Sequence, residues 1–304
     1  MRRAFVKALI KLAEKDKRIY LLTADLGYHA LEEFAQKFPE RFVNCGVAEQ
    51  NMMGVAAGLA LSEKKPYVYS IVPFVTFRCL EQIRNDICYQ NLDVKIIGVG
   101  GGFSYGTLGS THVVLEDLAI LRALPNINVL SPADLLSTEE LIAKSYKTKN
   151  PSYIRLSNAG SAKAYEKKPN LQIGKPNVLR DGKDKAIIAT GIQVSLCLEA
   201  AEELNKKGHD FKILDIHTIK PINKQALLRE LRGVKKVFTV EEHGATGGLG
   251  SAVAEILAES EWHGVFKIIA TPNEFLSKIG KPEYLRKKYL IDKQGILKNI
   301  LKFL

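Results

Sequence analysis

The hydrophobic positions of the chain alternate between short β-rich runs and longer stretches in which apolar residues recur at helical spacing. In the first half, strands are predicted at 18–22, 66–71, 94–98, 128–130 and 152–155. The intervening helical stretches are 50–61, 77–89, 115–123 and 136–146. Strands separated in this way by helices predict an α/β layer with a largely parallel sheet.

The second half repeats this pattern after a break. Residues 161–183 are polar and rich in Lys, Pro and Gly, which is typical of a linker. Strands are then predicted at 185–190, 211–215, 236–241 and 265–269, with helices at 195–207, 224–233 and 249–259. We therefore expect two α/β domains, 1–160 and 184–304, joined by the linker 161–183.

The start of the chain predicts an amphipathic helix followed by a strand. Its basic opening, MRRAFVKALIKLAEKDKR, has Lys and Glu at helical period between the apolar positions, whereas a signal peptide needs an unbroken apolar region. No run of eighteen apolar residues occurs, so no membrane span is predicted. The expected location is the cytoplasm. The four cysteines lack CxxC spacing and lie in apolar stretches, which indicates reduced core thiols without a disulfide or zinc site.

The net charge of +11, from 44 basic and 33 acidic residues, raises the possibility of nucleic-acid binding. However, the basic residues are scattered through amphipathic helices and loops, and they are not interleaved with aromatic residues as on an RNA-binding surface. The charge favours anionic substrates or an acidic partner subunit instead.

Glu49 is the most informative single residue. Within 44–61, NCGVAEQNMMGVAAGLAL, it is the one acid, and Cys45 is the one other ionisable side chain. The pattern places Glu49 near the start of a helix that enters the interior. Such a carboxylate can complement the helix dipole, or it can share a proton with a ligand.

Several blocks of the sequence decide between these interpretations. The segment GVAEQNMMGVAAGLAL resembles the pyrimidine domain of transketolases. The resemblance continues through 74–84 (FVTFRCLEQIR), 109–112 (GSTH), 118–132 and 239–250 (TVEEHGATGGLG), in the same order. 1-Deoxyxylulose-5-phosphate synthases and the beta subunits of 2-oxo acid dehydrogenases share these blocks. The resemblance implies a pyrimidine-binding domain, a C-terminal domain and thiamine diphosphate as cofactor.

The resemblance assigns roles to individual residues. The acid matching Glu49 hydrogen-bonds a pyrimidine ring nitrogen and promotes the imino tautomer that deprotonates the thiazolium carbon. An aromatic residue stacks on the pyrimidine, and both Phe74 and Phe77 are candidates. His112 matches a histidine that moves protons on the substrate, although its alternative is a helix start capped by Thr111.

Two further positions match less specifically. Asp25 ends a strand where the family keeps an acid near the cofactor, but Asp-x-Gly is also an ordinary turn. His243 lies in a strong family signature with a weakly defined role, so it is left out of the predicted catalytic set.

One family motif is missing. Thiamine-dependent enzymes hold the diphosphate through Mg²⁺ bound at a GDG motif with a downstream Asn, and this sequence contains no GDG. We therefore expect a partner, an N-terminal transketolase-like subunit, to hold Mg²⁺ and diphosphate, with no metal ligands in this chain. A heterotetramer or a homodimer of this chain is the expected assembly.

The substrate positions depart from the family. Leu108 replaces an acid and Val113 replaces a Gln beside His112, while Asn158 and Gly100 replace an Arg and a His used for phosphate. Only Arg155 remains nearby, so the usual pentose phosphates are not indicated. The predicted activity is transfer of a two-carbon ketol unit from a ketose donor to an aldehyde acceptor. The alternatives are the beta subunit of a 2-oxo acid dehydrogenase or decarboxylase, and a noncatalytic regulatory subunit.

Overall fold

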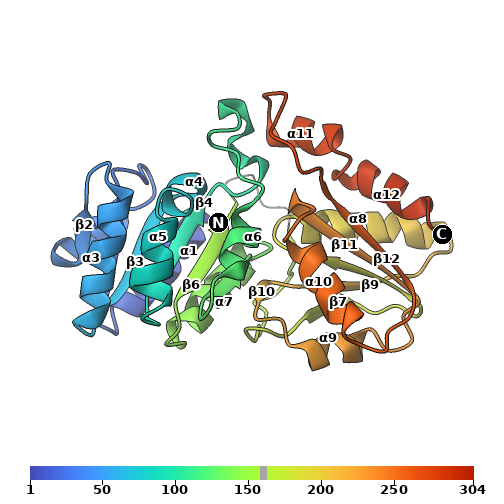
Figure 1. Ribbon diagram of the computed structural model, residues 1–304, viewed down its shortest axis with the longest axis horizontal. Coiled ribbons are helices and arrows are strands. Elements are labelled where there is room, and N and C mark those ends of the chain that lie inside the picture. Colours follow the sequence, from blue (N-terminus) through green and yellow to red (C-terminus); the bar gives the residue numbers. More distant parts are fainter. Residues whose placement is uncertain (158–162) are drawn as a thin grey trace.

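The computed structural model describes residues 1–157 and 163–304, which form two α/β units placed side by side (Figure 1). The first unit contains a seven-stranded sheet of order β10-β5-β6-β4-β3-β1-β2, and the second a five-stranded sheet of order β12-β11-β8-β9-β7. Most neighbouring strands are parallel, but β10 is antiparallel to β5 and β7 is antiparallel to β9. The predicted fold class, two α/β domains with largely parallel sheets, is confirmed.

The first unit alternates strands and helices in chain order. Its strands are β1 (Ile19–Thr23), β2 (Phe42–Asn44), β3 (Lys65–Ile71), β4 (Lys95–Val99), β5 (Asn128–Leu130) and β6 (Ser152–Leu156). Its helices are α1 (Arg2–Ala13), α2 (Glu32–Lys37), α3 (Glu49–Leu61), α4 (Val72–Val75), α5 (Leu80–Gln82), α6 (Asp117–Ala123) and α7 (Leu135–Tyr146). The helix predicted at 77–89 is formed by a turn, by α5 and by the π-helical segment η2 (Ile83–Cys88).

The second unit follows the same plan. Its strands are β7 (Asn177–Arg180), β8 (Lys185–Ala189), β9 (Lys212–Asp215), β11 (Lys236–Gly244) and β12 (Val265–Thr271). Its helices are α8 (Gln193–Lys206), α9 (Lys224–Glu230), α10 (Leu249–Ala258), α11 (Pro282–Lys288) and α12 (Lys293–Leu301). Strand β7 lies within the stretch interpreted as a linker, while Asn158 and the boundary expected at 160/161 lie outside the described residues.

Strand β10 (Thr218–Lys220) connects the two units. It follows β9 in the chain, yet it pairs with β5 of the first sheet, with Thr218 opposite Leu130. Next to this pairing, the Ser131 N–H donates to the His217 carbonyl at 2.9 Å. The first sheet is therefore completed by a segment from the second half of the sequence.

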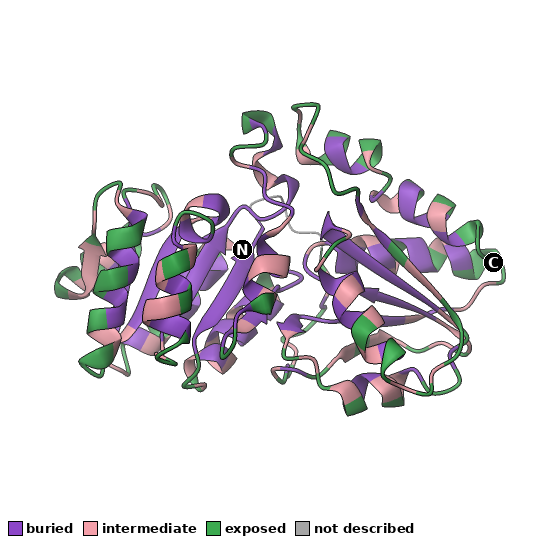
Figure 2. Cartoon of the chain, in the orientation of Figure 1, coloured by how far each residue is buried: buried purple, intermediate pink, exposed green. Residues whose placement is uncertain are grey.

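The core is continuous across the junction. Strands β3, β4 and β6 are buried along almost their whole length, as expected for parallel strands covered by helices on both faces (Figure 2). One hydrophobic cluster includes Leu118 and Leu121 of α6 together with Ile188, Leu214 and Val253 of the second unit. Burial of shared apolar surface thus joins the units.

A buried arginine of the first unit also contacts the second unit. The Arg155 guanidinium on β6 donates to both Asp117 oxygens, with Nε at 2.8 Å from Oδ2, and Tyr153 Oη donates to the same Oδ2 at 2.7 Å. Arg155 also donates to the Glu242 carbonyl on β11 at 3.2 Å. One side chain therefore fixes β6, α6 and β11 relative to one another.

Glu242 makes a second connection. Its side chain is paired with Arg286 of α11, and its Oε1 accepts a hydrogen bond from the Phe103 N–H at 2.8 Å. Phe103 begins the 3-10 segment η3 (Phe103–Leu108), so the loop after β4 is attached to the second unit.

Two predictions about the chain as a whole can be compared with the structure. No helix in the described ranges is long and apolar enough to cross a membrane. All four cysteines are free, and Cys79, Cys88 and Cys197 are buried, as predicted for core thiols.

We expect Arg155→Met to lower the free energy of unfolding by about 3–5 kcal/mol, because it leaves the Asp117 carboxylate buried without its counter-charge. Urea unfolding measures the change. The matched control is Arg180→Met, which removes a partly exposed guanidinium 3.6 Å from Asp210 and should cost less than about 1 kcal/mol. Equal losses in the two variants would contradict a special role for the buried pair.

Candidate functional site

Four adjacent parallel strands, in the order β4-β3-β1-β2, bring the predicted site residues to one edge of the first sheet. Asp25 follows β1, Glu49 follows β2, Phe74 follows β3 and His112 lies in the loop region after β4. Ligands of open α/β sheets bind outside the carboxyl ends of the strands. The topology therefore brings these four positions to the edge where a ligand is expected.

Glu49 is the first residue of α3 and is almost completely buried, with 2% of its surface exposed. Its Oε2 accepts a hydrogen bond from Nη1 of Arg78 at 2.7 Å, which forms an ion pair. The Arg78 side chain is 45% exposed. The charge of the buried carboxylate is thus balanced by a guanidinium that reaches in from the surface.

Phe74 lies next to this pair. The Arg78 guanidinium carbon is 4.5 Å from the centroid of the Phe74 ring, within the range of a cation–π contact. On the same ring, His112 packs in a T-shaped arrangement with the centroids 5.3 Å apart and the planes at 73°. Glu49, Arg78, Phe74 and His112 therefore form one continuous set of contacts.

Phe77 and Asp25 lie outside this set of contacts. Phe77 is in the turn after α4 and is 37% exposed. Asp25 has a left-handed φ of 52°, and its Oδ1 accepts hydrogen bonds from Tyr28 and Asn44 at 3.1 Å each. The geometry thus favours Phe74 over Phe77 as the aromatic neighbour of Glu49.

Cys79 lies behind the Glu49–Arg78 pair. Its thiol donates to the Phe74 carbonyl at 3.2 Å. Burial, together with the nearby Glu49, raises the pKa of the Cys79 thiol to about 12. This sulfur is therefore a neutral packing group and not a nucleophile.

The glycine-rich stretch after β4 packs against protein. A Cβ on Gly101 would lie 2.5 Å from the Arg155 side chain, and one on Gly102 would lie 2.2 Å from Glu242. Gly102 also has a left-handed φ of 66°. Arg155, the basic residue found in the sequence near the expected phosphate positions, is only 7% exposed and is held by Asp117. This arginine is therefore not available to a substrate phosphate in this arrangement.

His243 is buried and contacts backbone groups through both of its ring nitrogens. It is fully buried at the end of β11, where its Nδ1 contacts the Gly244 carbonyl at 2.8 Å and its Nε2 accepts from the Ala119 N–H at 3.4 Å. These contacts require the neutral Nδ1–H tautomer. His243 therefore holds α6 against β11, away from Glu49.

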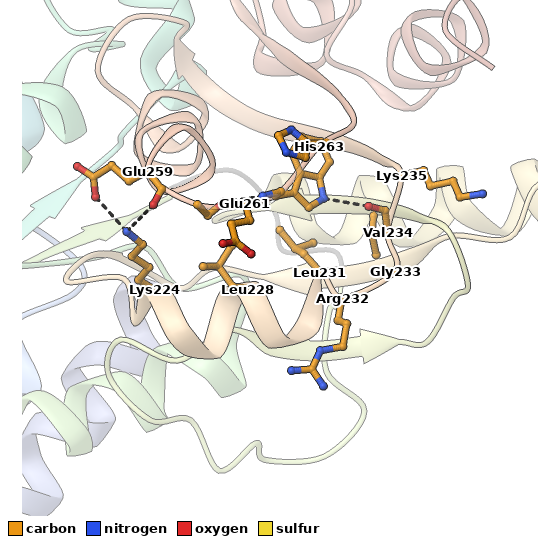
Figure 3. A pocket seen from close by; sticks show the side chains of 12 residues that line it. Lys224, Leu228, Leu231, Arg232, Gly233, Val234, Lys235, Glu259, Glu261 and His263 are labelled. Atoms are coloured by element: carbon orange, nitrogen blue, oxygen red, sulfur yellow. Dashed lines mark hydrogen bonds and ion pairs between the residues drawn. The ribbon is translucent and has the colours of Figure 1, made fainter.

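A large pocket lies in another part of the molecule. It has a volume of about 700 Å³ and lies between α9, the residues that follow it up to Lys235, and the segment 259–263 that joins α10 to β12 (Figure 3). Trp262 forms part of its wall and donates to the Val234 carbonyl at 2.9 Å. None of the predicted site residues lines it, so its size does not identify it as the active site.

The described residues fit one end of thiamine diphosphate. A buried carboxylate beside an aromatic ring suits an aminopyrimidine, which needs a proton-sharing partner and a flat surface. In the described ranges, no cluster of three or more His, Cys, Asp or Glu is placed to hold a metal ion. The fit is therefore to the pyrimidine end of the cofactor.

Comparisons with known proteins agree with this geometry. Residues 1–160 match the family model for the transketolase pyrimidine-binding domain, and residues 174–296 match that for the transketolase C-terminal domain. The chain belongs to the transketolase family. Thiamine diphosphate dependence follows from these domains.

Individual transketolase relatives match the chain almost end to end. An apulose-4-phosphate transketolase subunit of Phocaeicola vulgatus is 38% identical over 304 residues, covering 99% of this chain and 96% of the relative. The 6-deoxy-6-sulfo-D-fructose transketolase subunit SqwH of a Clostridium species is 34% identical, covering 98% and 92%. A solved structure described as a split gene transketolase, inactive beta4 tetramer, has a TM-score of 0.91 and 37% identity, covering 99% and 97%.

These relatives are transketolase subunits, and the prediction of a transketolase-like C-terminal subunit, a transferase acting with a partner, is confirmed at that level. Arg78 is the residue of this contact set that sequence reasoning missed. It lies within the block FVTFRCLEQIR, but no local pattern indicated that its side chain turns back to the start of α3. The sequence signal for such a residue is Glu49 itself, an acid without a charged neighbour in 44–61, because a buried carboxylate requires a counter-charge.

We expect wild type to lose stability relative to His243→Gln as the pH falls from 7 to 5. Burial lowers the pKa of His243 to about 4, below the 6.5 of an unfolded histidine, so the unfolded state binds the extra proton in this range. The relative loss should be about 2 kcal/mol by urea unfolding, at about 1.4 kcal/mol per pH unit below 6.5.

The control is His263→Gln, which removes an exposed imidazole and should change the free energy of unfolding by less than about 0.5 kcal/mol. A pH-independent difference between wild type and His243→Gln would mean that His243 is not held neutral by the fold.

Proposed function

We propose that this chain is the catalytic C-terminal subunit of a split transketolase that moves a two-carbon ketol unit from a ketose donor to an aldehyde acceptor. The observation that carries the proposal is the position of the buried Glu49 carboxylate beside the Phe74 ring and His112, at the carboxyl edge of a parallel sheet. When bound, thiamine diphosphate supplies the stabilisation of negative charge on carbon that cleavage next to a carbonyl requires.

Each residue of the site has a proposed task. Glu49, almost completely buried at the start of α3, shares a proton with a pyrimidine ring nitrogen. Phe74 provides the stacking face, and its neighbour His112 is placed to hold or move a proton on the substrate. Asp25 lines the same sheet edge and is proposed to lie near the cofactor.

A partner subunit is proposed to supply the other end of the cofactor. This sequence has no GDG motif, so Mg²⁺ and the diphosphate are assigned to an N-terminal transketolase-like subunit. The active site then lies between the two subunits, in a heterotetramer or around a homodimer of this chain. The excess of basic over acidic residues, 44 to 33, favours an acidic partner or anionic substrates.

We expect Glu49→Gln to reduce ketol transfer by the reconstituted complex by at least about 100-fold, because the amide cannot share a proton with the pyrimidine as a carboxyl does. Coupled assays of ketose cleavage measure this loss. Glu63→Gln, an exposed change in the turn after α3, is the control. Full activity of Glu49→Gln complexes would favour a noncatalytic regulatory subunit instead.

The isolated chain should neither retain thiamine diphosphate nor catalyse ketol transfer. Titration calorimetry with thiamine diphosphate and Mg²⁺ should show no tight binding by this chain and tight binding after addition of the partner. Tight Mg²⁺-dependent binding by the chain alone would overturn the split-site proposal, since the diphosphate and metal would then have ligands here.

A further inference from the structure

The Arg78 guanidinium makes both contacts that the proposed function assigns to the aminopyrimidine. It hydrogen-bonds Glu49 Oε2 at 2.7 Å, and its carbon lies 4.5 Å from the centroid of the Phe74 ring. A guanidinium and an aminopyrimidine are both flat, nitrogen-rich groups that can lie on an aromatic ring. The guanidinium donates to the carboxylate, and the pyrimidine ring nitrogen would share a proton with it. Two such groups cannot occupy one ring face and one carboxylate oxygen together.

From this we propose that Arg78 is a positioning residue. In the free subunit its guanidinium occupies the position that the pyrimidine ring takes in the complex, and the cofactor displaces it during assembly. The inference rests on the proposed function, because it concerns the same two contacts. It adds that cofactor affinity is set in part by a competition inside this chain.

The surroundings of Arg78 allow this exchange. Arg78 lies in the turn of residues 76–79, between α4 and α5, and its side chain is 45% exposed. Glu49 and Phe74 are held instead by helices α3 and α4. The exposed arginine can therefore swing into solvent, while the carboxylate and the ring stay in place.

The exchange also has a physical reason. A carboxylate with only 2% of its surface exposed is costly without a partner, and the free subunit has only its own side chains to supply one. Arg78 supplies the counter-charge before assembly, and the proton-sharing pyrimidine takes over afterwards. The same pair thus keeps Glu49 in place for the cofactor and competes with it.

The test compares thiamine diphosphate binding, in the presence of Mg²⁺, by complexes that contain wild-type chain, Arg78→Met or Arg78→Lys. Met keeps an unbranched stem but cannot pair with Glu49, so its complex should bind with a roughly tenfold lower Kd by titration calorimetry. Lys keeps the charge without the flat guanidinium, so it should fall between the two. Arg229→Met, which removes an exposed arginine from α9, is the control and should match wild type.

A second measurement uses the free subunit. Arg78→Met should lower its Tm, and adding Glu49→Gln to that variant should restore most of the loss, because a neutral amide needs no counter-charge. A loss that Glu49→Gln does not relieve would assign Arg78 a packing role unconnected with the carboxylate and overturn the inference.

The outcomes distinguish failure of the competition by Arg78 from failure of the proposed function. Equal or weaker cofactor binding by the Arg78→Met complex would overturn the competition and leave the proposed function intact. Absence of thiamine diphosphate binding by the wild-type complex would overturn the proposed function, and the competition with it.

Discussion

The buried Arg155 guanidinium, held by Asp117, is the constraint on which the arrangement of the two units depends. Arg155 belongs to a central strand of the first sheet, Asp117 begins α6, and the same guanidinium reaches the Glu242 carbonyl on β11. A charge so deeply buried tolerates few geometries, because each lost hydrogen bond leaves a polar group without solvent. The relative position of the two units is therefore specified by directional contacts in addition to apolar packing, and the loop that leads to His112 is held between its attachments to both.

The site makes a different use of charge. In the Arg155–Asp117 pair, acid and base are both buried and stabilise the fold. In the Arg78–Glu49 pair, a buried acid is paired with an arginine that is nearly half exposed. Both members of the first pair are shielded from solvent, which suits a permanent structural contact. The second has one solvent-exposed member, which suits the proposed exchange. Burial of the partner, more than the presence of an ion pair, therefore distinguishes the structural carboxylate Asp117 from the proposed functional carboxylate Glu49.

The sequence predicted those parts of the fold that depend on local pattern. Strands such as β3 and β8 and helices such as α3 and α7 appear close to where the pattern placed them, because the strands are short β-rich runs buried along most of their length and the helices have apolar residues at helical spacing. Strands β2 and β10 are not among the predicted strands; each has three residues, and β2 has no buried residue. For the site, resemblance predicted that Glu49, His112 and either Phe74 or Phe77 surround the cofactor. The contact of Arg78 with Glu49 joins residues 29 positions apart and depends on tertiary structure. The choice between Phe74 and Phe77 likewise needed side-chain directions, which a turn sequence does not encode.

Strand β10 has a consequence for how the chain can be divided. The family models separate the sequence after residue 160, yet the first sheet ends with a strand formed by residues 218–220. A fragment cut at that boundary would present β5, with Val129 and Leu130, as an uncovered edge open to pairing with other chains. In this protein the unit of sequence homology and the unit of folding are therefore not the same, and a recombined or truncated transketolase subunit has to carry its last strand with it.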